Sequence, residues 1–219
     1  MLERNKLKNK IRIYGAAMIL FMLFFASGCA RTVTPPFSPG KTITFNVDFK
    51  EDIDPSVYRY YIIINSSEVV QLPFMPIEFI EPGDIPSQPE INYQDYYDTW
   101  DYYFVLEGNA IYFATGPFST SEAVTKEAIA TWTGNEPKKL QISYDIGRLY
   151  PSPTPTVLYF DFVTVGFSDK IVKDNLSPSN SGPSTQYINT TYAGAYVNGS
   201  DEDIGSGDFD ITNWSVTTQ

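Results

Sequence analysis

The sequence predicts an all-β fold, in which two antiparallel sheets pack as a β-sandwich. About eight short segments carry apolar side chains at every second position or are rich in β-branched and aromatic residues, which is typical of strands. Turns rich in Gly, Pro and Asn separate these segments. The likeness to immunoglobulin domains is one of architecture only, because the chain lacks their Cys…Trp…Cys spacing. We expect residues 42–219 to form this single domain.

The predicted strands differ in pattern. Residues 42–49 alternate polar and apolar side chains, which indicates a strand with one buried face. Apart from Arg59, residues 57–64 are all aromatic or β-branched and predict a central strand. In chain order, the predicted strands are 42–49, 57–64, 101–106, 110–114, 140–146, 157–165, 193–197 and 209–216.

Two local signals refine this pattern. Gly108-Asn109 lies between two predicted strands and predicts a two-residue hairpin turn. In the last strand the alternation slips between Ile211 and Trp214. This slip predicts a β-bulge at Thr212 or Asn213.

Residues 119–132 allow two interpretations. Ser119 and Glu122 fit a capping box, and the apolar residues after them lie near helical spacing, which favours a short helix. The threonine and tryptophan side chains of the same segment suit an edge strand instead. Residues 71–94, with five prolines, and residues 176–186, rich in Ser, Pro, Asn and Gly, predict long loops.

The N-terminus has the pattern of an export signal. Residues 1–12 carry five basic side chains and one acidic one, and residues 13–25 are apolar. This apolar run is shorter than the roughly 20 residues that cross a bilayer, although an uncleaved signal anchor is an alternative. We expect residues 1–28 to form a signal helix that is removed, and residues 29–41 to form a Pro-rich tether.

The sequence Ala26-Ser27-Gly28-Cys29 resembles the lipobox of bacterial lipoproteins. The resemblance implies that Cys29 is diacylated through its sulfur and becomes the first residue of the mature chain. Ala30, rather than an aspartate, follows the cysteine, which in this family implies an outer membrane or cell-surface location. The alternative is an ordinary secretory signal with an incidental cysteine. Residues 160–165 and 210–216 also look like parts of uncharacterised envelope lipoproteins, a likeness that carries no functional residue across.

Composition excludes several kinds of chemistry. The chain has no histidine and one cysteine, which excludes Ser-His-Asp and Cys-His catalysis, histidine-based zinc sites and intramolecular disulfides. The formal net charge is −11, and it becomes −15 once the +4 of residues 1–28 is removed. Such a charge disfavours nucleic acid as a partner and is compatible with divalent cations.

The acidic loop 201–210 is the first candidate site. Its carboxylates alternate with glycines, so the loop can bend around a hard cation such as Ca²⁺ and supply several oxygen ligands. The alternative is a solvated hairpin loop that keeps the end of a sheet from aggregating. The candidate calcium ligands are Asp201, Asp203, Asp208 and Asp210.

A tyrosine-rich segment is the second candidate site. Its rings lie among aspartates, and rings can stack on a sugar while carboxylates accept hydrogen bonds from its hydroxyls. The alternative is a strand entering the core with its tyrosine hydroxyls at the rim. We expect Trp100, Tyr102 and Phe104 to share one face in the core. The candidate ligand-binding residues are Tyr93, Tyr96 and Tyr97.

Together these patterns favour a lipid-anchored, extracytoplasmic, non-enzymatic module that serves in interaction or in the structure of the cell envelope. The first alternative is a glycan-binding module, stabilised by calcium. The second is a hydrolase based on carboxylates, for which Asp161, set in an apolar strand, is the residue to examine. A hydrogen-bonded structural aspartate is the simpler interpretation of Asp161. The expected partners are the membrane, through the lipid, and a glycan or an envelope protein.

Overall fold

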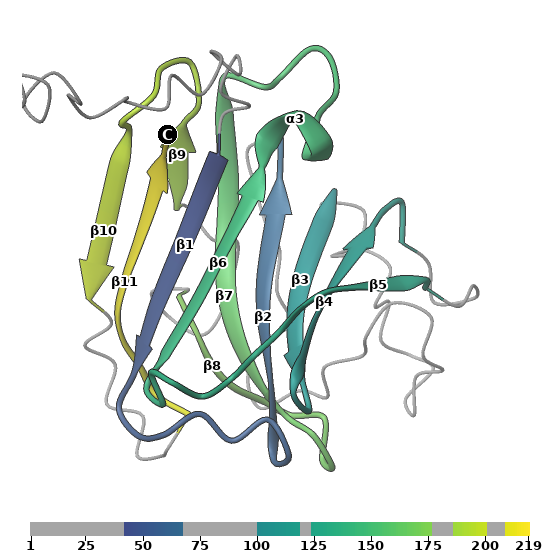
Figure 1. Cartoon of the computed structure of the whole chain (residues 1–219), viewed down its shortest axis with the longest axis vertical. Coiled ribbons are helices and arrows are strands. Elements are labelled where there is room, and N and C mark those ends of the chain that lie inside the picture. The colour runs from purple at the N-terminus through teal and green to yellow at the C-terminus, as the bar shows by residue number, and fades with distance from the viewer. Residues whose placement is uncertain (1–41, 68–99, 119–123, 177–185, 201–208) are drawn as a thin grey trace, which may run out of the picture. The chain divides into compact units, whose positions relative to one another are not determined.

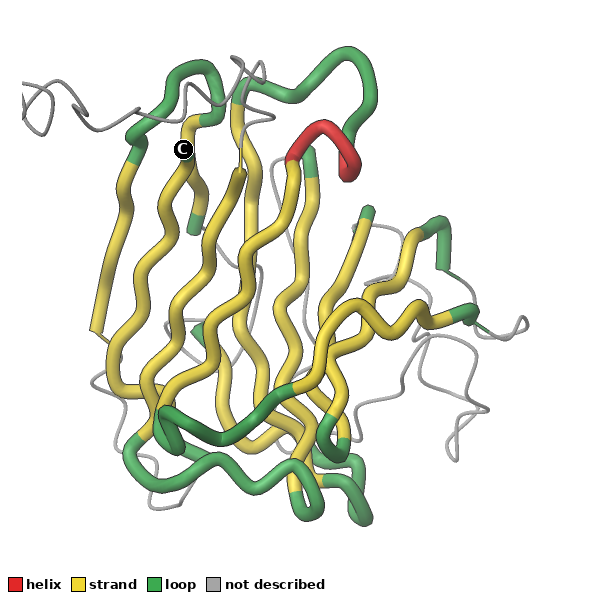
Figure 2. Tube along the Cα trace, viewed as in Figure 1, coloured by secondary structure: helices red, strands yellow, loops and turns green. Residues whose placement is uncertain are grey.

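The structure is a computed structural model that describes residues 42–67, 100–118, 124–176, 186–200 and 209–219. Two antiparallel sheets pack against each other (Figures 1 and 2), which confirms the predicted β-sandwich. The described ranges contain eleven strands and one four-residue helix. The expected signal helix and tether, and most of the two expected long loops, lie outside these ranges.

The smaller sheet has four strands in the order β10-β11-β1-β6. Along β1 the apolar side chains are buried and the polar ones between them are half-buried, as the alternation predicted. The polar face carries side-chain hydrogen bonds such as Thr44 to Ser143 at 2.9 Å and Gln141 to Asn46 at 2.7 Å. The strands are β10 Tyr196–Ser200, β11 Ile211–Thr218, β1 Thr42–Phe49 and β6 Lys139–Asp145.

The larger sheet has seven strands, in the order β5-β4-β3-β2-β7-β8, and β9 pairs with the other end of β7. Strand β2 lies in the middle between β3 and β7, as expected for residues 57–64. The helix α3, Ile146–Leu149, follows β6 directly. The strands are β5 Lys126–Thr131, β4 Ala110–Thr115, β3 Tyr102–Glu107, β2 Tyr58–Asn65, β7 Val157–Gly166, β8 Val172–Asn175 and β9 Tyr187–Asn189.

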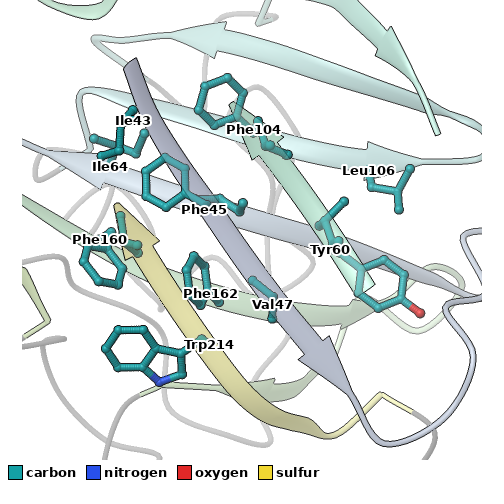
Figure 3. Packing of buried hydrophobic residues seen from close by; sticks show 14 of the residues in the cluster. Ile43, Phe45, Val47, Tyr60, Ile64, Phe104, Leu106, Phe160, Phe162 and Trp214 are labelled. Carbon is teal, nitrogen blue, oxygen red and sulfur yellow. The ribbon is translucent and has the colours of Figure 1, made fainter. Parts of the chain in front are cut away.

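Aromatic side chains from both sheets fill the core between them (Figure 3). The Phe45 ring of β1 lies 6.0–6.4 Å from the rings of Phe104, Phe160 and Phe162 in the larger sheet. Trp214 of β11 makes edge-on contacts with two of these rings, at 5.5 and 6.2 Å. Such tilted and edge-to-face pairs each add about 0.5–1.5 kcal/mol beyond the burial of their area.

The larger sheet is buried on its other face as well. A second cluster there joins β2, β3 and β7, which explains why residues 60–64 are apolar without alternation. Trp100 belongs to this cluster with Tyr103, whereas Tyr102 and Phe104 face the four-stranded sheet. The prediction that Trp100 shares their face was wrong, because Asp101 forms a bend before β3 begins and breaks the alternation. The buried members are Tyr61, Ile63, Trp100, Tyr103, Val105, Ala114, Phe118, Val163, Val165 and Val172.

Three backbone features explain the local geometry. The turn between β3 and β4 has Gly108 at φ +61°, a left-handed conformation that glycine adopts without strain. Asp48 pairs with Asn213 and Phe49 with Ile211, so Thr212 is the extra residue of the predicted bulge. Gly199 lies opposite Trp214, and a Cβ atom there would come within 2.6 Å of the indole.

The described part of residues 119–132 is a strand and not a helix. Residues 126–131 form β5, which pairs with β4 and carries an irregularity between Ala128 and Ala130. Pairing with a sheet edge therefore outweighs the weak helical spacing of this segment. The possible capping residues Ser119 and Glu122 lie outside the described residues.

Candidate functional site

Most residues of the two sites expected from the sequence lie outside the described residues. This holds for Cys29, for the three tyrosines Tyr93, Tyr96 and Tyr97, and for Asp201, Asp203 and Asp208. Asp210 is described, and its Oδ2 lies 3.6 Å from the Nζ of Lys50. In the described ranges, no three His, Cys, Asp or Glu side chains gather as metal ligands would.

The two buried carboxylates on the described strands of the larger sheet have structural partners. Asp161 on β7 accepts a hydrogen bond from the backbone N–H of Leu176 at 3.2 Å. Asp174 on β8 accepts one from the backbone N–H of Ile211 at 2.6 Å and so ties β8 to the start of β11. Neither aspartate lines either of the two surface pockets described below. Their geometry fits the structural interpretation of Asp161.

A charged cluster fastens three strands of the larger sheet to one another. Glu107, at the end of β3, accepts from Arg59 of β2 at 2.9 Å and from Lys126 of β5 at 3.0 Å. Burial opposes ionisation of Glu107, but the hydrogen bonds and charges of Lys126 and Arg59 outweigh it, so its pKa lies below the ordinary value. We assign this cluster to the stability of the sheet.

Three exposed tyrosines gather at the edge where β9 and β10 lie. Tyr187, Tyr192 and Tyr196 are 56%, 57% and 62% exposed, and they line one pocket of about 340 Å³. We call this site the tyrosine pocket. Its lining residues in the described ranges are Gln186, Tyr187, Ile188, Asn189, Tyr192, Ala195, Tyr196 and Val197.

The alternation of side chains along β9 and β10 places two of these tyrosines on the outside of the sandwich. On β9, Ile188 is buried in the core, so its neighbours Tyr187 and Asn189 face outward. The Tyr187 ring lies 5.8 Å from the ring of Tyr159, its partner across the β7–β9 pair. Tyr196 is the first residue of β10 and alternates with half-buried Val197. The rings therefore stand on paired strands, which limits the entropy lost when a ligand binds.

The turn that carries Tyr192 is held by its backbone. The Tyr192 carbonyl accepts a hydrogen bond from the Oγ1 of Thr218, and the N–H of Gly194 donates to the Thr218 carbonyl at 2.6 Å. Gly194 has φ +85°, so the chain can turn sharply into β10. Asn189 Oδ1 accepts from the N–H of Thr191 at 2.8 Å at the other end of the turn. The turn is fixed while the Tyr192 side chain remains exposed.

The tyrosine pocket carries no charged side chain among the described residues that line it. Two amide side chains, Gln186 and Asn189, stand beside three phenol groups and an apolar floor. Exposed aromatic patches tend to mark interaction sites, and a few polar groups in an apolar pocket fix the orientation of a ligand. The arrangement suits an uncharged ligand that has both apolar faces and hydroxyl groups.

Sequence reasoning missed this site. Its signal is the spacing of Tyr187, Tyr192 and Tyr196 within the polar stretch 186–200. The pocket, however, depends on the pairing of β9 with β7 and on the position of β10 at the edge of the other sheet. The sequence alone does not reveal that these two edges adjoin.

A second, larger pocket lies at the opposite edges of the two sheets. It has a volume of about 630 Å³ and lies between β5 and β6. Unlike the tyrosine pocket, it carries charged side chains, namely Glu127, Asp145 and Arg148. We call it the β5–β6 groove.

Comparison of the chain with protein-family models, with curated proteins and with solved structures found no match. In the described ranges, no helix has the length and apolar character needed to cross a bilayer. The functional argument therefore depends on the geometry of the sandwich and on the N-terminal sequence.

Proposed function

We propose that this protein is a lipid-anchored, extracytoplasmic β-sandwich without enzymatic activity, which binds a ligand of the cell envelope through the tyrosine pocket. The observation that carries the proposal is the gathering of three tyrosines, each more than half exposed, around one pocket. Exposing the apolar area of a ring to water raises the free energy of the protein. Several exposed rings at one place therefore indicate a surface that binds a partner.

A neutral glycan is the ligand class that best fits this pocket. The apolar face of a pyranose stacks on a tyrosine ring, and its hydroxyls exchange hydrogen bonds with phenol and amide groups. A lining free of charged side chains in the described residues, in a chain of net charge −11, gives a charged ligand no specific partner there. The alternative of an envelope protein as ligand shares the same surface.

Missing catalytic groups support a binding role over a catalytic one. The chain has no histidine and a single cysteine, and the buried aspartates of the larger sheet have backbone hydrogen-bond partners. The tyrosine pocket contains no carboxylate among its described lining residues, whereas glycoside hydrolysis requires a pair of them.

An array of neutral glycans, probed with the purified full chain, tests the ligand class. We expect binding to a subset of the neutral glycans, and a loss of about tenfold in affinity for each of Tyr187→Ala, Tyr192→Ala and Tyr196→Ala, the usual size for an exposed aromatic anchor. Phe167→Ala is the matched control, because Phe167 is an exposed ring (39%) outside the tyrosine pocket. Absence of binding to every glycan would remove the glycan proposal.

Labelled palmitate tests the anchor separately. We expect the label to be incorporated into the wild-type chain in the bacterial host and to be lost in Cys29→Ser, together with membrane fractionation. Two acyl chains hold a protein stably because each buried CH₂ contributes about 0.8 kcal/mol. If Cys29→Ser keeps both the label and the membrane association, the chain is held by another device.

A further inference from the structure

The β5–β6 groove lies between the strands that end the two sheets in the described part of the chain. Strand β6 ends the four-stranded sheet and β5 ends the seven-stranded one, and residues of both strands line the groove. In Figure 1, β6 is the strand of the four-stranded sheet farthest from β10, and β5 lies on the side of β6 that is turned away from β10. We propose that this groove binds an extended peptide segment of another protein, which pairs with β6 as an added strand.

The register of β1 shows which backbone groups of β6 face the groove. Thr42 and Gln219 exchange both backbone hydrogen bonds, so the backbone of Thr42 faces β11. Phe49 donates to the carbonyl of Lys138, so the backbone of Phe49 faces the β6 side. Because backbone groups alternate sides in an antiparallel strand, odd-numbered residues of β1 bond to β6. Their partners are Leu140, Ile142 and Tyr144.

The remaining residues of β6 direct their N–H and C=O groups to the free edge. Of these, Gln141 and Ser143 line the groove. Their side chains are bonded to neighbouring β1 residues, Gln141 to Asn46 at 2.7 Å and Ser143 to Thr44 at 2.9 Å. The side chains are thereby held on the face of the sheet, and among the described residues no second strand pairs with the backbone edge of β6.

Within its own seven described residues, strand β6 carries neither of two features that often protect an edge, a proline or a bulge. It runs for seven residues, contains no proline, and pairs with β1 without a register shift. Natural edge strands are usually interrupted by bulges, prolines or inward-pointing charges, because an open ladder of N–H and C=O groups recruits another strand. Main-chain pairing of this kind gives affinity, and pockets for alternate side chains give specificity.

The residues that line the groove indicate what kind of peptide it can bind. On the apolar side, Ile111, Ile129 and Ile142 offer contacts to the inward side chains of an added strand. Strand β5 forms the opposite wall, which limits the width of an occupant beside β6. The charged side chains that line the groove are Glu127, Asp145 and Arg148, so its net charge is negative and favours a basic residue in the occupant. A second copy of this chain is disfavoured by its net charge of −11.

The test uses the purified full chain and a synthetic eight-residue peptide that alternates valine with lysine and threonine. We expect calorimetry to detect binding, and hydrogen exchange of the Gln141 and Ser143 amides to slow by at least about tenfold on binding. The amides of Leu140 and Ile142, already paired with β1, should change little. A peptide with N-methyl groups on alternate amides keeps its side chains but loses those donors, and it should not bind.

Proline at the edge provides a second, independent test. Ser143→Pro removes an edge-facing N–H and the side-chain bond to Thr44 but leaves the backbone bonds between β1 and β6 in place. Proline is tolerated at such an edge position, and the substitution should abolish peptide binding. Asn198→Pro on β10 is the matched control, because the same alternation turns its N–H to the free edge of β10. If Ser143→Pro does not fold, the N-methyl peptide still tests whether binding depends on backbone pairing. Equal binding of both peptides, protection confined to other amides, or no binding at all would overturn the proposal.

Discussion

The two sheets of this sandwich bury their residues in different ways. In the four-stranded sheet, β1 has an apolar face in the core and a polar face that carries side-chain hydrogen bonds. In the seven-stranded sheet, β2 is buried on both faces. The two pockets that we propose as binding surfaces lie where the sheets end. Both the tyrosine pocket and the β5–β6 groove lie at such edges.

The largest effect should come from the two faces of β2. Ile62 faces the four-stranded sheet, Ile63 faces the second cluster, and both are fully buried. We expect Ile62→Ala and Ile63→Ala each to lower the free energy of unfolding by about 2–5 kcal/mol. Thr44→Ala, on the polar face of β1, should cost about 1 kcal/mol or less. Urea denaturation of the full chain measures all three.

The comparison between the two sheets depends on a large loss of stability at both isoleucines. A loss for Ile63→Ala as small as that for Thr44→Ala would mean that the outer face of the larger sheet is not a core. Equal losses for the two isoleucines would establish that β2 is stabilised from both sides.

A smaller effect is expected at the edge strand β10. Gly199→Val places a side chain against the Trp214 indole, which a Cβ atom alone would approach within 2.6 Å. Since Trp214 packs on Phe160 and Phe162, it has little room to shift, and overpacking of this kind costs about 1–3 kcal/mol. Thermal unfolding should show a lower Tm for Gly199→Val. The control Asn198→Val should have nearly the Tm of the wild type. An unchanged Tm in Gly199→Val would show that the indole moves freely.

The charged cluster on the larger sheet should contribute less again. Glu107→Gln is expected to lower the free energy of unfolding by about 1–2 kcal/mol at pH 7, because two basic partners lose their carboxylate. The pKa of Glu107 is lowered in the folded chain, so its contribution is present above the ordinary value of 4.5 and is lost as the pH falls through the folded value.

A pH series of unfolding experiments checks this sign. The difference between wild type and Glu107→Gln should be largest near neutral pH and should shrink below pH 4.5. Glu136→Gln is the control, since Glu136 is 72% exposed and pairs with Lys139 only at 3.8 Å. A difference that grows on acidification would contradict the assignment.

The sequence predicts those parts of the fold in which a single strand carries its own signal. Alternation in residues 42–49 fixes the buried face of β1, and the phase slip locates the bulge at Thr212. Strands β8 and β9, of four and three residues, are too short to show a period. Trp100 was placed on the wrong face because the bend at Asp101 depends on the fold. The tyrosine pocket likewise depends on pairings between distant segments.

The tyrosine pocket should affect stability least and binding most. Because Tyr187, Tyr192 and Tyr196 are exposed, truncating all three should change the free energy of unfolding by no more than about 1 kcal/mol in total, within the range of surface substitutions. The same variant should lose most of its affinity for a neutral glycan.

Calorimetric titration of the full chain with the best-binding neutral glycan, in wild type and in the triple variant Tyr187→Ala/Tyr192→Ala/Tyr196→Ala, is the most direct test. The account predicts that affinity falls by at least about a hundredfold, more than 2.7 kcal/mol, while the Tm stays within a few degrees of wild type. Undiminished affinity in a folded triple variant would contradict it and place the binding site elsewhere in the chain.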